Sequence, residues 1–333
     1  MTAYDRFQQA FGGSISSENH LSMPLIMTFA SRWIGVTYKD YLQDPTLQAR
    51  AQFETAKAFG IDTLGAISDP VTELSSMGGA IVWFEDDPPA PDPLTVFLSD
   101  YARLDDLRAP DPRGNNRMGL RLQAIQEMKR LSDHQYPVMG WVEGPISMAA
   151  VMRGMTNLME DLIDDPEVIH RLFTFCVDVA MKYAAAQVDF GADFIGFGDA
   201  PASLIGPSYY QELVLPYEQE MIRRMHELGV PVRMHICGNT TKLFPYMAQS
   251  GADIIDIDSI ADFGLACDQI PSTIHLLGNL DPVREVLNGE PIAIRERIDE
   301  CRALARDRYV IGAGCEIPAR TPHANLAEFR SQI

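Results

Sequence analysis

The stretch PVRMHICGNTTKLFPYMAQSGADIIDID, residues 231–258, contains two short apolar runs on either side of a longer, helix-like segment. The runs at 232–236 and 253–256 contain β-branched residues and have the length of buried strands. Gly251 stands just before the second run, where a glycine commonly ends a helix. This order of strand, helix and strand is typical of a βα unit, in which both strands run parallel in one sheet.

The same alternation continues along most of the chain. Eight runs are predicted as strands: 24–29, 62–67, 137–143, 193–197, 232–236, 253–256, 274–278 and 309–313. Helical patterns lie between most of them, for example at 44–59, 118–131, 209–228 and 291–305. Eight such units without a Pro- or Gly-rich linker predict an α/β protein made of one (β/α)8 barrel, or TIM barrel, as a single domain over residues 1–333. An open, doubly wound sheet is the alternative.

Residues 77–93, MGGAIVWFEDDPPAPDP, do not fit a simple connection between a strand and a helix. The segment is irregular and rich in proline and acidic residues, and it follows the second predicted strand. We expect an insertion that covers one end of the barrel, because long connections without a clear element usually have a function of their own.

Composition limits the class of protein. The 333 residues are 46% hydrophobic and 22% charged, and the mean hydropathy is −0.08, as in globular proteins with a sizeable core. The net charge of −19 repels phosphate backbones and anionic lipids, so nucleic acid is not expected as a partner. Neither a signal-peptide layout nor an apolar run of about 18 residues is found, so no membrane association is expected and the predicted location is the cytoplasm.

The five cysteines do not suggest a disulfide framework, because their number is odd and they are widely spread: Cys176, Cys237, Cys267, Cys301 and Cys315. We expect thiols that are buried or bind metal. Cys176 and Cys301 fall within helical patterns, where a small core residue is the simpler interpretation.

Polar residues follow the predicted strands, and in such barrels the active site lies at the C-terminal ends of the strands. In chain order they are Arg32, Asp69, Glu143, Asp199, His235 with Cys237, Asp256 with Asp258, Asn279 with Asp281, and Cys315 with Glu316. For Asp69, Asp199 and Asp281, a role in turns or helix caps is an equally good explanation. The pattern therefore predicts a polar site at this edge of the barrel.

His235 and Cys237 are two residues apart on one predicted strand, so their side chains point to the same side. Cys315 ends the last predicted strand and can approach them around a closed barrel. Singly, a histidine or a cysteine here is more often an ordinary core residue. Together, one imidazole and two thiolates form a typical zinc site with its fourth position open, as in catalytic sites. Zinc with two thiolates favours activation of a thiol over activation of water.

Several longer motifs resemble the uroporphyrinogen decarboxylase superfamily, and within it the zinc- and corrinoid-dependent methyltransferases similar to methylcobamide:coenzyme M methyltransferase. The resemblance runs from about residue 24 to the C-terminus. It is carried by EGPISMA (143–149), GDAPAS (198–203), HICGNTT (235–241), SGADIIDID (250–258), LGNLDP (277–282) and GAGCEIPARTPHANL (312–326).

The decarboxylase branch of that superfamily uses no metal and has an arginine-rich segment near the N-terminus, an aspartate after the second strand, a tyrosine in the helix after the third strand and a histidine near the end. Here Arg32 and Asp69 remain, while Thr28, Val151 and Cys315 occupy the positions of the first arginine, the tyrosine and the histidine. The loss of cations that would hold carboxylates argues against decarboxylation. A cysteine at the late position favours the zinc branch.

The resemblance implies that zinc activates a methyl acceptor, which takes the methyl group of a methylcobamide carried by a small corrinoid-binding protein. It implies zinc ligation by His235, Cys237 and Cys315. From their positions at the strand ends we predict catalytic roles for Asp69, Glu143 and Asp199, and substrate binding by Arg32 and Asn279. The acceptor is a thiol such as coenzyme M, or tetrahydrofolate. Three alternatives stay open: a demethylase that moves methyl from a methoxy or methylamine compound to a corrinoid protein, a decarboxylase-like lyase, and a non-catalytic protein that binds zinc or a tetrapyrrole.

Overall fold

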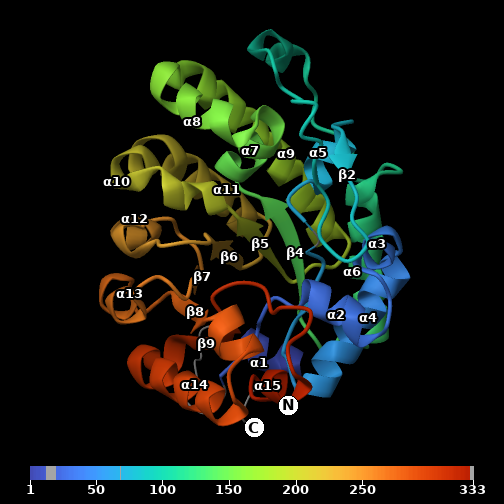
Figure 1. The fold of residues 1–333 in the computed structure, drawn as a ribbon, viewed down its shortest axis with the longest axis vertical. Coiled ribbons are helices and arrows are strands. Elements are labelled where there is room, and N and C mark those ends of the chain that lie inside the picture. Colours follow the sequence, from blue (N-terminus) through green and yellow to red (C-terminus); the bar gives the residue numbers. More distant parts are fainter. Residues whose placement is uncertain (13–19, 68, 331–333) are drawn as a thin grey trace.

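The structure, a computed structural model, describes residues 1–12, 20–67 and 69–330. Within them a curled, all-parallel sheet of seven strands lies at the centre, with helices around it (Figure 1). The strands are β1 (Leu64–Gly65), β4 (Val138–Glu143), β5 (Phe194–Gly198), β6 (Val232–His235), β7 (Ile254–Ile257), β8 (His275–Leu280) and β9 (Tyr309–Ala313), paired in that order. Each overlaps one of the last seven predicted strands, and this parallel barrel confirms the predicted fold class.

The prediction of a strand at residues 24–29 is wrong. The chain is extended earlier, at residues 21–25, and helix α2 (Met27–Trp33) begins soon afterwards. Short apolar runs do not distinguish a strand from a buried helix by periodicity, which explains the error. The extended segment still takes the place of a barrel strand, because Ser22 forms a parallel bridge to Ile311 of β9 and its carbonyl accepts a bond from the Asp62 N–H, just before β1. Backbone hydrogen bonds therefore close the ring.

Helices surround the sheet; most cover its outside, whereas Phe7 of the first helix packs against Phe194 of β5 in the cluster inside the barrel. The helices are α1 (Ala3–Phe11), α2, α3 (Tyr38–Gln43), α4 (Pro45–Phe59), α5 (Thr72–Ser76), α6 (Arg117–Leu131), α7 (Pro145–Arg153), α8 (Met155–Asp164), α9 (Pro166–Asp189), α10 (Gly206–Tyr209), α11 (Leu215–Glu227), α12 (Phe244–Met247), α13 (Phe263–Gln269), α14 (Pro291–Ala305) and α15 (His323–Ala327). Short 3-10 or π turns are η1 (Tyr101–Asp106), η2 (Ala200–Leu204), η3 (Tyr210–Val214), η4 (Thr241–Leu243), η5 (Pro282–Leu287) and η6 (Arg306–Arg308). Among the described residues, no helix is both long and apolar enough to cross a membrane.

The segment 77–93 lies between α5 and α6 and forms a small antiparallel hairpin of β2 (Ile81–Val82) and β3 (Ala90–Pro91). The guanidinium of Arg117 stacks on the ring of Trp83 in this hairpin, at 4.9 Å from the ring centroid. The hairpin follows β1, as predicted, and its role as a cover for the barrel stays a prediction.

Two apolar clusters divide the side chains of the strands. On β4, Val138 and Val142 pack outward against the helices, whereas Met139 and Trp141 belong to the cluster inside the barrel. Because side chains alternate along a strand, Glu143 shares the inward side of β4. By the same alternation, residues 233 and 235 of β6 and residue 256 of β7 point into the barrel.

Candidate active site

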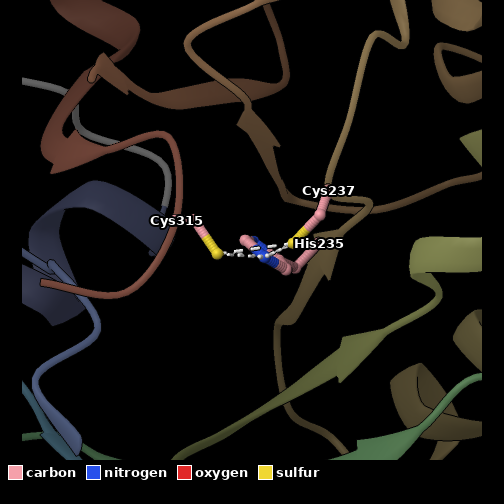
Figure 2. A group of neighbouring side chains, drawn as sticks. All are labelled: His235, Cys237 and Cys315. Carbon is pink, nitrogen blue, oxygen red and sulfur yellow. Dashed lines mark hydrogen bonds between the residues drawn. The ribbon is translucent and has the colours of Figure 1, made fainter. Parts of the chain in front are cut away.

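His235, Cys237 and Cys315 lie together at the C-terminal edge of the barrel (Figure 2). His235 is the last residue of β6, and Cys315 stands two residues beyond β9. Nε2 of His235 is 2.8 Å from Sγ of Cys237 and 3.9 Å from Sγ of Cys315, and the two sulfur atoms are 3.4 Å apart. The structure thus brings the three predicted metal ligands into one cluster.

Two glycines allow the cysteines to approach each other. Gly238 follows Cys237 and has a φ of +103°, a backbone conformation that residues other than glycine rarely adopt. Its N–H donates to Asp258 at 2.7 Å. Gly314 precedes Cys315, and a Cβ there would lie 2.3 Å from the backbone nitrogen of Ser259. The loops after β7 and β9 therefore touch through their backbones, which holds Cys315 close to the end of β6.

The other ring nitrogen of His235 faces a carboxylate. Nδ1 lies 2.7 Å from Oδ2 of Asp256, and the Arg233 guanidinium bonds the same carboxylate. Burial tends to raise the pKa of Asp256, but the charge of Arg233 and the hydrogen bond from His235 hold that pKa below its usual range. An ionised Asp256 accepts a hydrogen bond from Nδ1–H, so a metal at the cluster would be bound through Nε2, the arrangement usual for histidine metal ligands.

The donor set fits a zinc ion. A tetrahedral centre with Zn–S bonds of about 2.3 Å and Zn–N bonds of about 2.0 Å separates its ligand atoms by roughly 3.5–3.8 Å. The two sulfur atoms, 3.4 Å apart, and Nε2 and Sγ of Cys315, 3.9 Å apart, are near this range, whereas Nε2 and Sγ of Cys237, at 2.8 Å, are closer together. The hydrogen bond from Cys237 lowers the pKa of Cys315 to about 4, while the same interaction raises the pKa of Cys237. The protein alone therefore stabilises one of the two thiolates, and a cation is needed to stabilise both.

Arg32 lies on α2, which follows the extended segment 21–25 that takes the place of the first strand. It lines a cavity of about 420 Å³ together with Thr28, Ser31 and Thr37. The backbone N–H and the hydroxyl of Thr28 both donate to Glu316, at 2.7 and 2.6 Å. Burial raises the pKa of Glu316 to about 7. Arg32 therefore lines a cavity linked to Cys315 through Thr28 and Glu316.

Glu143 and Asp69 lie in a second polar region of the same edge. Glu143 accepts a bond from the Trp141 indole at 3.3 Å, and its own N–H donates to Glu73 at 3.0 Å. Burial, and then the charge of Glu73, raise the pKa of Glu143 well above its usual value. Asp69 is held by Arg117, whose NH1 is 2.9 Å away, and it also accepts the N–H of Val71. Asp69 is therefore already engaged in an ion pair with Arg117, and its catalytic role stays a prediction.

Asp199 is fully buried. One of its oxygens accepts the N–H of Ser147 at 2.8 Å, and its own N–H donates to the His235 carbonyl at 2.9 Å. Burial, with the neighbouring charge of Glu218, raises its pKa well above the usual value. Glu218 in turn accepts a 2.5 Å bond from Tyr210. Asp199 therefore joins β5, β6 and α7, a position that supports the end of β6 from behind.

Asn279 is predicted to bind substrate, but its side chain is bonded to other parts of the protein. Its amide nitrogen donates to the carbonyls of Asp258 and Ala261, and its oxygen accepts a bond from Arg297 of α14 at 2.6 Å. Both polar atoms of the amide therefore have protein partners, and Asn279 fixes the β8 end against α14.

Sequence reasoning missed three groups near the site: the buried Glu73 and Arg233, and the partly buried Arg117. Glu73 and Arg117 lie on helices, where no strand-end rule points to them. Arg233 stands two residues before His235, so the alternation that paired His235 with Cys237 could also have placed it inside the barrel.

The sequence matches the uroporphyrinogen decarboxylase (URO-D) family over residues 22–333. The chain belongs to this family. Methylcobamide:CoM methyltransferase MtbA of Methanosarcina acetivorans is 35% identical over 212 residues, which are 63% of this chain and 61% of that relative. The match therefore spans less than two thirds of that relative. Methylated-thiol–coenzyme M methyltransferase of Methanosarcina mazei is 29% identical over 286 residues, 84% of this chain and 74% of the relative.

Among solved structures, a methyltransferase from Methanosarcina mazei superposes on this URO-D family member with a TM-score of 0.90. The superposition covers 99% of this chain and 97% of that chain, at 20% sequence identity. At this identity the likeness shows that the two proteins share the barrel fold.

Proposed function

We propose that this URO-D family protein is a zinc-dependent methyltransferase that moves a methyl group from a methylcobamide to a small thiol. The carrying observation is the cluster of His235, Cys237 and Cys315, whose ligand atoms lie within 4.8 Å of one another. The similarity to relatives named methylcobamide:CoM and methylated-thiol–coenzyme M methyltransferase supports the reaction class. The methylcobamide is supplied by a separate small corrinoid-binding protein.

The chain's own residues hold and orient the reactants. His235 and the two cysteines bind the metal, and Asp256 fixes the ring of His235. When bound, zinc lowers the pKa of an acceptor thiol so that it is a nucleophile at neutral pH. The acceptor sulfur takes the methyl group, and the electron pair of the carbon–cobalt bond remains on cobalt as cob(I)amide. Positioning of the two reactants supplies much of the rate.

The residues around the cluster argue against decarboxylation of a tetrapyrrole. Binding several carboxylates requires free cations, but Arg117 is held by Asp69 and Arg233 by Asp256. Thr28, at the position of a decarboxylase arginine, donates both of its bonds to Glu316. This edge of the barrel is therefore better suited to a metal and a thiol than to a polycarboxylate.

The proposal is tested by incubating the zinc-loaded protein anaerobically with methylcobalamin and a set of acceptors. We expect demethylation of the corrin, seen in its absorption spectrum, that depends on an added thiol and is lost in Cys237→Ala and Cys315→Ala. Cys267→Ala is the matched control, because Cys267 lies on α13 outside the cluster. Failure of every thiol, with tetrahydrofolate also inactive, would contradict the proposal.

The same assay separates the remaining functions. Transfer to tetrahydrofolate alone would change the acceptor. Methylation of cob(I)alamin by a methoxy or methylamine compound, without thiol-dependent demethylation, would place the enzyme on the donor side. Tight binding of corrin without turnover would indicate a binding protein.

A further inference from the structure

We propose that Arg233 is a positioning residue for the metal site and acts through Asp256 and His235. The inference rests on the proposed zinc site and concerns a residue that neither touches the metal ligands' donor atoms nor reaches the mouth of the barrel. Arg233 lies inside the barrel and is 1% exposed, as is Asp256.

Arg233 holds the Asp256 carboxylate by three contacts. Its Nε lies 2.9 Å from Oδ1 and 3.1 Å from Oδ2, and its NH2 lies 2.8 Å from Oδ2. Oδ2 also faces Nδ1 of His235 at 2.7 Å. A planar guanidinium can grip both oxygens of a carboxylate at once, which fixes the plane of that carboxylate. The orientation of Asp256, and through it the ring of His235, is therefore set by Arg233.

The other end of the guanidinium reaches the opposite wall of the barrel. NH1 of Arg233 donates to the carbonyl of Met23 at 3.0 Å. Met23 belongs to the extended segment 21–25 that closes the barrel between β9 and β1. One buried side chain thus connects β6, β7 and the closing segment. The ring of His235 is oriented by the closed barrel itself, and not only by its own strand.

Neutralising the charge of Asp256 is a simpler role for Arg233, and the two roles differ in what they predict. A neutralising cation needs no particular geometry, so Arg233→Lys would serve as well. A positioning role needs the planar fork, because a lysine ammonium is a point charge that cannot fix the plane of a carboxylate. Loss of groups that orient metal-bound histidines weakens metal binding roughly 10- to 100-fold.

The experiment measures zinc affinity by competition with a chromophoric chelator, and the absorption spectrum after replacement of zinc by Co²⁺. Wild type, Arg233→Met and Arg233→Lys are compared, with Arg121→Met as the matched control. Arg121 is also a buried arginine, 2% exposed, but it lies on α6 and bonds the carbonyl of Leu42. We expect both Arg233 variants to bind zinc about 10- to 100-fold more weakly with an altered cobalt spectrum, and Arg121→Met to match wild type.

The outcomes are distinguishable from failure of the proposed function. A wild-type protein that binds no zinc would overturn both proposals at once. Zinc binding by wild type with unchanged affinity and cobalt spectrum in Arg233→Met would overturn the positioning role alone. If Arg233→Met does not fold, Arg233→Lys decides, because wild-type affinity and spectrum in that variant would leave only charge neutralisation.

Discussion

Replacing Gly314 by alanine perturbs the metal site without touching a ligand. A Cβ at this position would lie 2.3 Å from the backbone nitrogen of Ser259 and 2.9 Å from the carbonyl carbon of Asp258. Both contacts are backbone atoms, so no side-chain rotation relieves them. Ordinary contact begins at 3.4 Å, and the loop that carries Cys315 must therefore move by about 1 Å, whereas metal–ligand distances tolerate about 0.2 Å.

A displacement of that size removes Cys315 from an effective position as ligand. We expect zinc affinity to fall by more than about 100-fold, beyond the usual effect of groups that only orient a ligand, with an overpacking cost of about 1–3 kcal/mol in unfolding free energy. Chelator competition measures the affinity, and the Co²⁺ spectrum reports the loss of one thiolate. Gly264→Ala on α13 is the control, since its Cβ approaches only the Asp262 side chain, at 3.3 Å. A folded Gly314→Ala protein with wild-type affinity and a two-thiolate spectrum would refute this reasoning.

Two further predictions concern the charged groups of the second polar region, Glu73 and the Asp69–Arg117 pair. Burial raises the pKa of Glu73 from 4.5 to about 7, so its proton stabilises the fold at low pH and this stabilisation declines between about pH 4.5 and pH 7. The unfolding free energy of Glu73→Gln, measured relative to wild type by urea unfolding of zinc-loaded protein, should therefore be about 3 kcal/mol larger at pH 8 than at pH 4. The same difference between variant and wild type at both pH values would contradict the shifted pKa. Arg117→Met leaves the Asp69 carboxylate buried and unpaired, so unfolding free energy should fall by about 3–5 kcal/mol. The control is Arg171→Met, which removes an exposed surface ion pair and should lower the unfolding free energy by about 1 kcal/mol or less. Equal losses of unfolding free energy in Arg117→Met and Arg171→Met would count against a buried ion pair.

The barrel could be predicted because its strands carry a local signal. The run at 309–313, for example, is apolar and ends before a glycine, and β9 occupies the same residues, Tyr309–Ala313. The segment at 24–29 is equally apolar, but its last three residues form the start of α2. What places residues 21–25 in the ring is a set of backbone bonds to Ile311 and Asp62, partners far away in sequence. Such pairing is not visible from local composition.

The metal cluster could be predicted for a different reason. Alternation along β6 put His235 and Cys237 on one side, and the order of units around a barrel brought Cys315 to the same edge. Asn279 shows the limit of that rule, because its amide bonds Arg297 on α14 and not a group in the mouth. Glu73 could not be found from strand ends, since it reaches the end of β4 from α5. A single domain over the whole chain stays a prediction.

X-ray absorption at the zinc edge tests the proposed ligand set most directly. The purified wild-type protein should contain one zinc per chain with two sulfur scatterers at about 2.3 Å and one nitrogen at about 2.0–2.1 Å from the protein. Cys237→Ala, if it retains zinc, should show one sulfur fewer, while Cys267→Ala should match wild type. A native protein without zinc, or with zinc bound only by nitrogen and oxygen, would contradict a metal centre of His235, Cys237 and Cys315.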